Sequence, residues 1–541
     1  METLRYLQIV VCLFSLSLAT SQNAEFWNQE AQDSLKEAIR LTERNVNTAK
    51  NIVLFLGDGM SIETLTAARI LKGQLAGGLG EDAKLAVEDF PHFGLAKTYS
   101  TNKQVPDSAA TATAYLCGVK TKTGVLGVDD RVERGDCVSS LGGEVKSILE
   151  MAQEAGKSVG FVTTTTLTHA SPGALYAKVP DRKWQSDMDI PRGERNLGCV
   201  DMAQQFVSNN NIQVALGGGR MKFMSRINRD PEYPSMPGSR IDGRNLIQEW
   251  INNKPDQDRA HYVWNEADFN KIDPEQTDYL LGLFEYSLMK FDIRRDNDTG
   301  GEPSIAEMTD KAIRILSKNP NGFFLFVEGG RIDHGHHFGV ANLALTETVA
   351  MDKAIDVALG LVDTEETLVM VTSDHAHTFK MAGYSARGNP ILGKSDGRST
   401  DLGSYTTVGY MNGPGAIISS LSYRLLGRRP PVTDANTGRP FYLPQAVVPT
   451  FLETHGGDDV AIFAIGPMSH LVHGVHEQNY VSHVMQRAAC IGYYADNCQP
   501  VQAAAGDDDF GTLSDATALR VDAKLGILLV FSVFLALVKI A

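Results

Sequence analysis

The stretch NIVLFLGDGM, residues 51–60, decides the fold, because a continuous apolar run leads directly into a small acidic turn. An apolar run without polar alternation is typical of a strand that is buried on both faces of a sheet. Gly57 and Gly59 flank Asp58 and allow the backbone to turn and to approach other groups closely. The segment therefore predicts a strand of a parallel sheet with a carboxylate at its carboxyl end.

The same apolar pattern recurs at other places along the chain. The further strand candidates are Ser158–Thr166, Ile212–Leu216, Gly322–Val327, Thr367–Thr372 and Val460–Ile465. Segments with helical periodicity lie between them, at Gly143–Ala155, Ser304–Ser317 and Ala341–Gly360. This alternation predicts an α/β fold, with a central, mostly parallel sheet and helices on both of its faces.

One part of the chain does not follow this pattern. From about Gly383 to Leu443 the sequence is rich in Gly, Pro, Arg, Tyr and Thr and has no clear helical period. We interpret residues 383–443 as a small inserted lobe outside the main sheet.

Four of the predicted strands are followed by acids, imidazoles or hydroxyls. In chain order these residues are Asp58, His169, Ser171, Glu328, Asp333, His337, Asp374 and His375. Any one of them alone would read as an ordinary polar loop residue. Because ligands bind at the carboxyl edge of an open α/β sheet, four such strand ends predict one assembled site.

The residue types at these strand ends, together with His455, suit metal ions. Mixed carboxylates and imidazoles without cysteine are typical of catalytic zinc, and oxygen ligands alone suit magnesium. Asp333 and His337 are four residues apart, so on a helical turn they face the same way. The adjacent pair Asp374 and His375 needs an extended or turn segment to reach one ion.

A serine supplies a candidate nucleophile. The stretch PDSAATATA, residues 106–114, is small and helix-permissive, with Ser108 at its start. A serine there lies beside unpaired backbone N–H groups and the positive end of the helix dipole, which also attract phosphate. The alternative is that Ser108 or Asp107 is only an N-cap. A metal ion could replace a general base by lowering the pKa of the hydroxyl.

Composition limits the partners. The chain has 541 residues, 43% of them hydrophobic, and a net charge of −15 with a pI of about 5.4. Such an acidic protein is not expected to bind nucleic acid through a general attraction to phosphates.

The cysteines predict an oxidising compartment. Of the six, Cys12 lies in the predicted leader, and five remain: Cys117, Cys137, Cys199, Cys490 and Cys498. An odd number means that at least one thiol is free or pairs between chains. Asn297 begins the sequon Asn-Asp-Thr and is the predicted glycosylation site.

The first residues read as a targeting signal. Residues 1–21 carry Arg5, the apolar run Leu7–Leu18 and small residues near Ser21, as a signal peptide does; the alternative is a short N-terminal membrane anchor. The mature chain would then begin at residue 22.

The last residues read as an anchor signal. Ser514, Asp515 and Ala516 precede the polar spacer Thr517–Lys524 and the apolar tail Leu525–Val538. This order predicts a glycosylphosphatidylinositol (GPI) attachment signal, with 501–514 as a linker, Ser514 as the attachment residue (Asp515 is the alternative) and 515–541 removed; the rival interpretation is a transmembrane helix.

Five motifs together resemble those of one family. They are LGDGM at 56–60, PDSAATATA at 106–114, VEGGRIDHGHH at 327–337, SDHAH at 373–377 and ETHGGDDV at 453–460. They resemble the signatures of alkaline phosphatases, and the similarity, closest to the animal, lipid-anchored members, runs from about Phe26 to Cys498. The resemblance implies a catalytic domain over 22–500 that hydrolyses phosphate monoesters of many kinds at the outer cell surface. It also implies a phosphoserine intermediate, two zinc ions and one magnesium ion.

The resemblance assigns each candidate a role. It makes Ser108 the nucleophile and Arg182 the residue that grips the phosphate oxygens. It gives one zinc to Asp333, His337 and His455, and the other to Asp58, Asp374 and His375, with Ser108 in contact. It gives magnesium to Asp58, Ser171 and Glu328. The supporting residues are His169, His334 and His377.

Further features follow from the same resemblance. A structural calcium ion would bind Glu232, the carbonyl of Phe284, Glu285 and Glu302, although the family normally has an aspartate at the last position. The disulfides would be Cys137–Cys199 and Cys490–Cys498, with Cys117 unpaired. A homodimer would form through an N-terminal helix near Phe26–Arg44 and the inserted, crown-like lobe.

Two other functions stay open. A phosphodiesterase or sulfatase of the same superfamily would share the scaffold, but Ser108 with the magnesium set favours monoesters. An anchored binding protein with an inactive fold is the non-enzymatic alternative. No predicted metal ligand is missing from the sequence, which argues against it.

Overall fold

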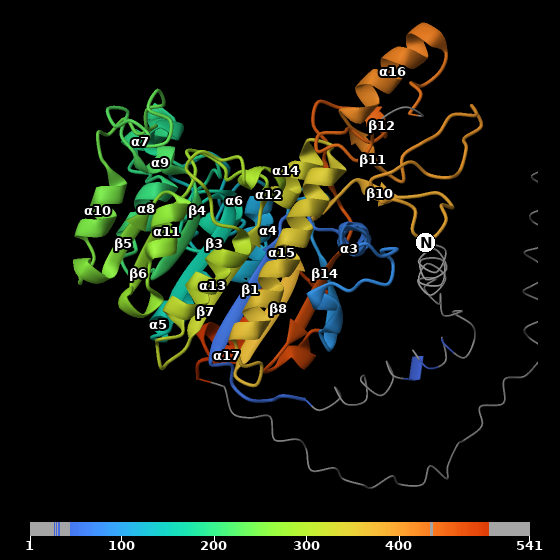
Figure 1. Ribbon diagram of the computed structural model, residues 1–541. Helices are drawn as coiled ribbons and strands as arrows, with labels where there is room; N and C mark the ends of the chain where they lie inside the picture. The colour runs from blue at the N-terminus through green and yellow to red at the C-terminus, as the bar shows by residue number, and fades with distance from the viewer. Residues whose placement is uncertain (1–25, 27–28, 30, 33–43, 433–435, 497–541) are drawn as a thin grey trace, which may run out of the picture. The chain divides into compact units, whose positions relative to one another are not determined.

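The computed structural model describes residues 44–432 and 436–496, together with Phe26, Gln29, Ala31 and Gln32 (Figure 1). Its main feature is a ten-stranded sheet in the order β15-β2-β14-β8-β1-β7-β3-β4-β6-β5. The strands are β1 (Asn51–Gly57), β2 (His92–Lys97), β3 (Ser158–Thr166), β4 (Val214–Gly218), β5 (Ala260–Val263), β6 (Tyr279–Leu283), β7 (Phe323–Gly329), β8 (Thr367–Ser373), β14 (Val460–Ile465) and β15 (Gly474–Glu477). Only β14 runs against its neighbours, so the prediction of a mostly parallel sheet is confirmed.

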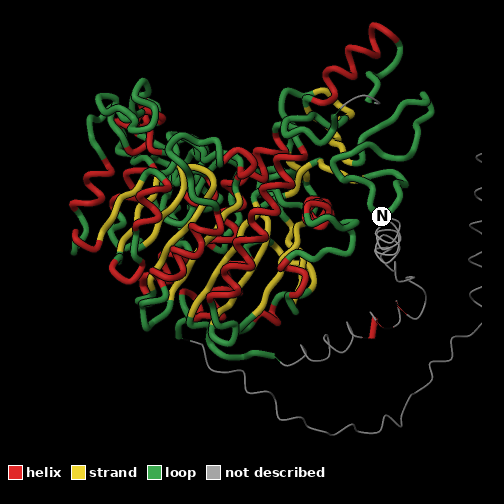
Figure 2. Tube along the Cα trace, viewed as in Figure 1, coloured by secondary structure: helices red, strands yellow, loops and turns green. Residues whose placement is uncertain are grey.

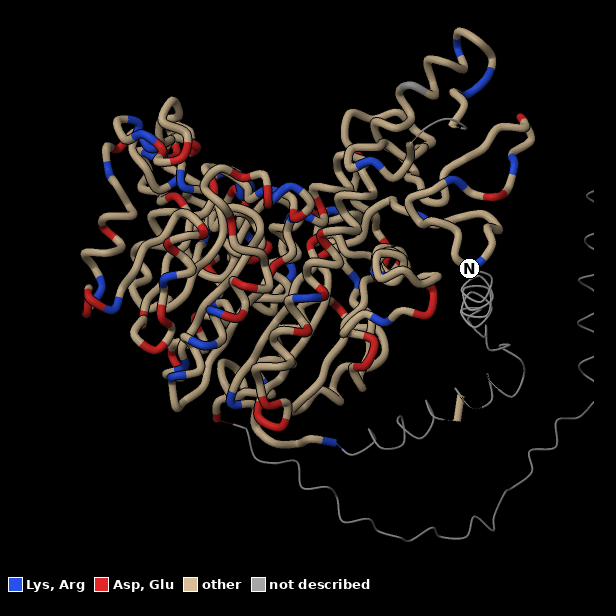
Figure 3. The backbone as a smooth tube through the Cα atoms, in the orientation of Figure 1, with Lys and Arg blue, Asp and Glu red and all other residues tan. Residues whose placement is uncertain are grey.

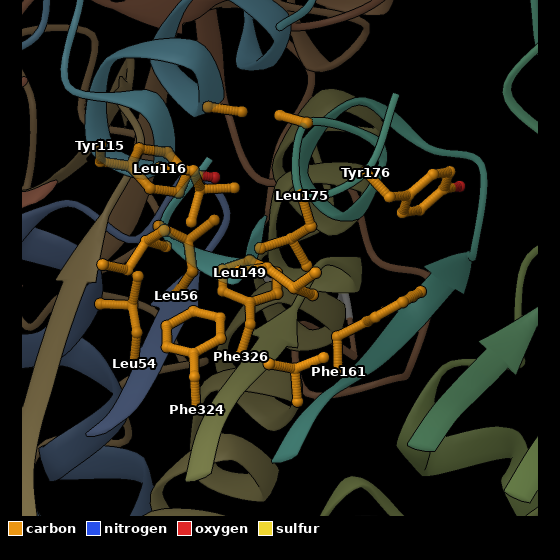
Figure 4. Packing of buried hydrophobic residues seen from close by; sticks show 14 of the residues in the cluster. Leu54, Leu56, Tyr115, Leu116, Leu149, Phe161, Leu175, Tyr176, Phe324 and Phe326 are labelled. Carbon is orange, nitrogen blue, oxygen red and sulfur yellow. The ribbon is translucent and has the colours of Figure 1, made fainter. Parts of the chain in front are cut away.

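Helices cover both faces of this sheet, as predicted. Leu54 and Leu56 of β1 pack on one face, in the core that includes residues of α4 (Ser108–Cys117), α5 (Ile148–Glu154) and α17 (Tyr480–Ala489); Figure 4 shows part of this packing. Val53 and Phe55 point to the other face, where residues of α3 (Ile62–Leu75), α13 (Ile305–Leu316) and α15 (Ala341–Leu361) complete a second core. In Figure 1, α13 and α15 lie in front of the sheet. Because side chains alternate along a strand, one continuous apolar run supplies both cores.

Helices and loops alternate between the strands (Figure 2). Their bounds are α3 (Ile62–Leu75), α4 (Ser108–Cys117), α5 (Ile148–Glu154), α6 (Ala170–Gly173), α7 (Arg192–Asn196), α8 (Met202–Ser208), α9 (Arg220–Phe223), α10 (Leu246–Asn252), α11 (Glu266–Lys271), α12 (Asp292–Arg295), α13 (Ile305–Leu316), α14 (Arg331–His337), α15 (Ala341–Leu361), α16 (Gly415–Leu426) and α17 (Tyr480–Ala489).

Some predicted boundaries differ from the structure. The helix predicted over 143–155 begins only at Ile148, because Ser147 caps it by accepting a hydrogen bond from the backbone N of Glu150. The strand predicted from Ile212 begins at Val214. The strands β2, β5, β6 and β15 were not predicted, since they are short and each contains partly exposed residues, with no buried residue at all in β15.

The segment predicted as an inserted lobe builds a sheet of its own. This sheet consists of β10 (Phe379–Met381), β11 (Val408–Gly413) and β12 (Ala446–Pro449). It therefore begins before residue 383 and ends after residue 443. The segment contains a helix, although its sequence shows no clear helical period. Helix α16 lies inside it, and its period was hidden because apolar residues occur around most of its surface.

Several predictions fall at the ends of the chain. The signal peptide, the anchor signal with Ser514, most of the N-terminal helix and Cys498 lie outside the described residues. Cys137 and Cys199 form a disulfide, as predicted, and Cys117 is a buried free thiol. Within the described part of the chain, no helix has the length and apolar character needed to cross a membrane.

Candidate metal centre

Three central strands bring the predicted ligands to one edge of the sheet. Strands β7 and β8 lie on either side of β1 and run parallel to it, with Gly57 opposite both Gly329 and Ser373. Asp58 follows β1 directly and Asp374 follows β8 directly. The carboxyl ends of these strands therefore deliver their polar residues to the same place.

Asp58, Asp374 and His375 form the first group. Their ligand atoms lie within 4.8 Å of one another, and all three side chains are fully buried. His375 Nε2 is 3.0 Å from Asp374 Oδ2 and 3.6 Å from Asp58 Oδ1. Gly59 donates its N–H to Asp374 Oδ1 at 2.9 Å. Its φ of +71° suits glycine, and a Cβ there would lie 2.5 Å from the His377 ring.

Asp333, His337 and His455 form the second group, with His377 beside them. Asp333 Oδ1 is 3.3 Å from His337 Nε2 and 3.4 Å from His455 Nε2, and one turn of α14 separates Asp333 from His337 as their spacing predicts. His455 Nε2 is 3.0 Å from His337 Nε2. The short ladder of β9 (Ala376–His377) and β13 (His455–Gly456) pairs His377 with His455.

Glu328 belongs to a third group at the end of β7. A ligand atom of Glu328 lies within 4.8 Å of one from Asp58 and one from His169. Thr163 of β3 stands opposite Glu328 in the sheet, and its hydroxyl bonds to Glu328 Oε2. The hydroxyl of Ser171 is among the groups that lower the pKa of Glu328, against the dominant effect of burial, which raises it to about 7. The His169 ring centroid is 5.6 Å from that of His334.

Ser108 lies beside these groups at the first position of α4. It is buried, and its Oγ is 3.3 Å from His375 Nε2. Asp107 is the N-cap of α4 and accepts from the Ala110 N–H at 3.3 Å. Asp107 Oδ2 also binds Arg182 Nη1 at 3.0 Å, which fixes this guanidinium near the helix start. The N-cap reading thus fits Asp107, and Ser108 remains free for another role.

The electrostatics of the centre favour bound cations. Burial, with Asp374 and Asp333 nearby, raises the pKa of Asp58 well above its usual value. Neither oxygen of Asp58, nor Oε1 of Glu328, has a hydrogen-bond partner among the described residues. Buried carboxylates without partners are costly, and clustered imidazoles offer lone pairs that a metal ion would engage. The donors present therefore fit divalent cations.

Two supporting residues were missed from the sequence. Glu453 is buried, and its Oε2 is 2.6 Å from His377 Nδ1, while the other ring nitrogen of His377 is 2.8 Å from Asp333 Oδ1. The backbone carbonyl of Glu453 accepts a hydrogen bond from His337 Nδ1 at 2.7 Å. Its place two residues before His455 was the available signal. No sequence signal marked Thr163, because threonine is common in β-strands and lies here within a run of β-branched residues.

The predicted calcium ligands also lie near one another. Glu232 and Glu285 have carboxylate oxygens within 4.8 Å of each other and of Asp298, which the sequence had not singled out. Glu302 is buried and accepts from the backbone N of Lys290 at 2.9 Å. The Phe284 side chain is buried. The Lys290 ammonium lies among these acids.

The fold and the site define a class: an α/β protein with clustered carboxylates and imidazoles for metal ions beside a serine at a helix start. The family model described as alkaline phosphatase matches residues 49–491. Human tissue-nonspecific alkaline phosphatase is 48% identical over 505 residues, covering 92% of this chain and 95% of the relative. An alkaline phosphatase of Gadus morhua is 49% identical over 474 residues, covering 86% and 97%. The chain belongs to the alkaline phosphatase family.

Solved structures share the fold. The alkaline phosphatase of Thermus thermophilus superposes with a TM-score of 0.59 at 24% identity, covering 84% of this chain and 94% of the other. That of the Antarctic bacterium TAB5 gives 0.56 at 23% identity, covering 83% and 99%. At these identities the likeness supports the architecture alone.

Proposed function

We propose that this chain hydrolyses phosphate monoesters of many kinds, with Ser108 as the nucleophile. The carrying observation is the position of Ser108, whose Oγ lies at the start of α4 and 3.3 Å from His375, inside the cluster of candidate metal ligands. Membership of the alkaline phosphatase family supports the same reaction.

The proposed metal set is two zinc ions and one magnesium ion. Asp333, His337 and His455 would hold one zinc, and Asp58, Asp374 and His375 the other, with Ser108 in contact. Asp58, Ser171 and Glu328 would hold magnesium. When bound, these ions lower the pKa of the serine hydroxyl and of water, and stabilise charge on attacking and departing oxygens.

The chain's own groups then position the ester. The Ser108 Oγ attacks phosphorus, an Oγ–P bond forms, and the bond from phosphorus to the alcohol oxygen breaks, so the alcohol leaves. Water then attacks the phosphoserine, the Oγ–P bond breaks, and inorganic phosphate is released. Arg182, held by Asp107, would bind two phosphate oxygens with its planar fork, and the N–H groups at the start of α4 add to this.

His169, His334 and His377 would orient ligands rather than bind zinc themselves. His377 contacts both Asp333 and Glu453, which supports this role. His334 Nδ1 donates to the Gly330 carbonyl at 3.1 Å, and the His169 ring lies beside that of His334.

Turnover of p-nitrophenyl phosphate tests the proposal. We expect Ser108→Ala to lower kcat by at least about 10³-fold, since it removes the nucleophile. Ser208→Ala, an exposed serine at the end of α8, is the matched control and should retain the wild-type rate. Chelation should abolish wild-type activity, and zinc with magnesium should restore it. Wild-type turnover by Ser108→Ala would overturn the nucleophile assignment, and faster cleavage of bis(p-nitrophenyl) phosphate would favour a phosphodiesterase.

A second copy of the chain is the proposed partner. Helix α16 and strand β12 expose a concentration of apolar side chains, at Leu421, Tyr423, Leu425, Leu426 and Val447. Apolar surface of this kind is typical of an interface, and the resemblance to animal alkaline phosphatases supports a homodimer. Sedimentation of the secreted protein tests it: Leu425→Glu should shift the dimer to monomer, and a wild-type monomer would refute it.

The proposed location is the outer face of the cell membrane, through a GPI anchor at Ser514. The tail sequence supports the anchor, and Asn297, exposed after α12, supports glycosylation in the secretory pathway. Release of activity from cells by a phosphatidylinositol-specific phospholipase would support it, and retention would refute it. Acidic and basic residues are interspersed over the chain (Figure 3), and with a net charge of −15 we propose no nucleic-acid partner.

A further inference from the structure

A second group of buried acids lies away from the strand ends that build the metal centre. It consists of Glu232, Glu285, Asp298 and Glu302, and we call it the Lys290 cluster because the Lys290 side chain enters it. Glu285 comes two residues after β6, and Asp298 and Glu302 lie between α12 and α13. These are the acids, with Asp298 added, at which the resemblance to alkaline phosphatases implied calcium.

The Lys290 ammonium contacts three groups in this cluster. It forms an ion pair with Glu285 Oε1, lies 3.3 Å from Asp298 Oδ1 and donates to the Tyr233 hydroxyl at 2.9 Å. The Glu285 side chain is 5% exposed and that of Asp298 1% exposed. Tyr233 also donates to Glu285 Oε1 at 2.9 Å, so ammonium and phenol converge on the same oxygen.

The remaining acids are held by other groups of the chain. Glu232 Oε2 binds the fully buried Arg220 at 2.6 Å, and Glu232 Oε1 accepts from the Gly300 N–H at 3.3 Å. Glu302 Oε2 accepts from the backbone N of Lys290. Its other oxygen and both oxygens of Asp298 have no hydrogen-bond partner among the described residues, although the ammonium lies at ion-pair distance from Asp298.

We propose that the Lys290 ammonium is the resident cation of this cluster, and that a divalent cation binds there only by displacing it. Calcium takes about six to eight oxygen ligands at about 2.3–2.6 Å. An ammonium between Glu285 and Asp298 occupies the space such an ion needs and repels it. Displacement would break both ion pairs. The acids alone would fit calcium; with Lys290 among them, they do not.

The inference is independent of the phosphatase reaction, so its test measures cation binding and thermal unfolding. The full-length enzyme, loaded with zinc and magnesium, is titrated with calcium chloride by calorimetry. Terbium luminescence sensitised by Tyr233, which contacts Glu285, reports whether a trivalent probe enters this cluster. The variants are Lys290→Gln, which removes the charge, and Lys290→Arg, which keeps it.

We expect wild type and Lys290→Arg to bind calcium no tighter than about 1 mM, at the weak end of protein calcium sites. Lys290→Gln should bind one calcium per chain at least about tenfold more tightly, and calcium should raise its Tm. Asp298→Asn in the Lys290→Gln background should abolish this gain. Lys271→Gln, an exposed lysine paired with Asp268, makes the same charge change elsewhere and should behave as wild type.

When Lys290→Gln folds, two results would overturn the proposal. One is wild-type binding of one calcium per chain as tightly as Lys290→Gln. The other is a folded Lys290→Gln that gains no calcium affinity, since the acids would then not form a cation site at all. If Lys290→Gln folds only when calcium is supplied, that result supports the proposal. If it does not fold under either condition, the wild-type titration decides: micromolar binding overturns the proposal and millimolar binding supports it.

Discussion

The candidate metal centre and the Lys290 cluster both bury several carboxylates, but they differ in where the balancing positive charge comes from. In the metal centre, Asp58 and Asp374 are surrounded by imidazoles and by each other, and Arg182, the nearby guanidinium, is already bound to Asp107. In the Lys290 cluster a lysine reaches into the acids. Buried carboxylates need partners in either place. The type of residue beside the acids therefore distinguishes the two sites. Imidazoles leave room for metal ions from outside, whereas a lysine supplies the cation from the chain itself.

A third buried carboxylate shows another way to remove charge. Glu347 of α15 accepts from the Asp292 N–H, and burial raises its pKa to about 8. A protonated carboxyl needs no cation. The molecule thus contains buried acids in three states that substitutions can distinguish. One is a candidate metal ligand, one is paired with a lysine, and one is protonated.

The largest expected effect comes from Asp58→Asn in the metal centre. The amide keeps the shape but removes the charge that the resemblance assigns to both zinc and magnesium, so we expect kcat to fall at least about 10³-fold. In chelator, Asp58→Asn should be more stable than the wild type. Without metal ions, the wild type keeps a buried carboxylate that has no hydrogen-bond partner among the described residues. Steady-state kinetics, bound-metal analysis and thermal unfolding check both parts.

Asp268→Asn, an exposed acid on α11, is the control for that substitution. Its kcat and its Tm in chelator should match those of the wild type. Full metal content and full activity in Asp58→Asn would contradict the prediction, because the Asp58 charge would then not be needed to hold metal ions.

A smaller effect is expected at Glu453, which positions imidazoles rather than touching substrate. Burial acts to lower the pKa of His377, but Glu453 and Asp333 raise it to about 10. Glu453→Gln should loosen His377 and lower zinc affinity and kcat by about 10- to 100-fold, as is usual for groups that orient ligands. Zinc competition with a chromophoric chelator and kcat in excess zinc separate lost metal from lost orientation.

Glu453→Asp should recover part of the activity if orientation is the role, while Glu154→Gln, an exposed acid at the end of α5, should have no effect. Equal zinc affinity and equal kcat in Glu453→Gln and wild type would show that the His377 contact does not matter for the centre.

Much of this molecule follows from its sequence, for physical reasons that also mark the limits. The strands β1, β7 and β8 were predictable because burial on both faces demands an unbroken apolar run, and their acids because ligand sites gather at carboxyl ends. The short strands β5 and β15 were not, since edge strands are held by one neighbour and carry mixed residues.

The parts of the site that escaped prediction depend on contacts between distant segments. Asp298 joins Glu232 only because the loop before α13 lies against a distant segment, as the hydrogen bond from the Gly300 N–H to Glu232, 68 residues earlier, shows; neither periodicity nor spacing reveals this. Glu453 reaches His377 through the β9–β13 ladder, 76 residues away in sequence. Both are decided by tertiary packing.

The smallest expected effect, at Glu347, tests the protonated state. A folded pKa of about 8, above the usual value near 4.5, means that the folded protein keeps a proton which the unfolded chain releases between these pH values. Stability from this group is therefore full below about pH 4.5 and is lost as the pH rises to about 8. Glu347→Gln mimics the protonated form, so it should leave Tm at pH 5 little changed and stabilise the protein increasingly at pH 7 and pH 9. Thermal unfolding of both proteins with zinc and magnesium present, at pH 5, 7 and 9, measures the difference. A constant offset between them across this range would mean that Glu347 stays ionised in the fold, and its burial would then need a cation, as in the other two clusters.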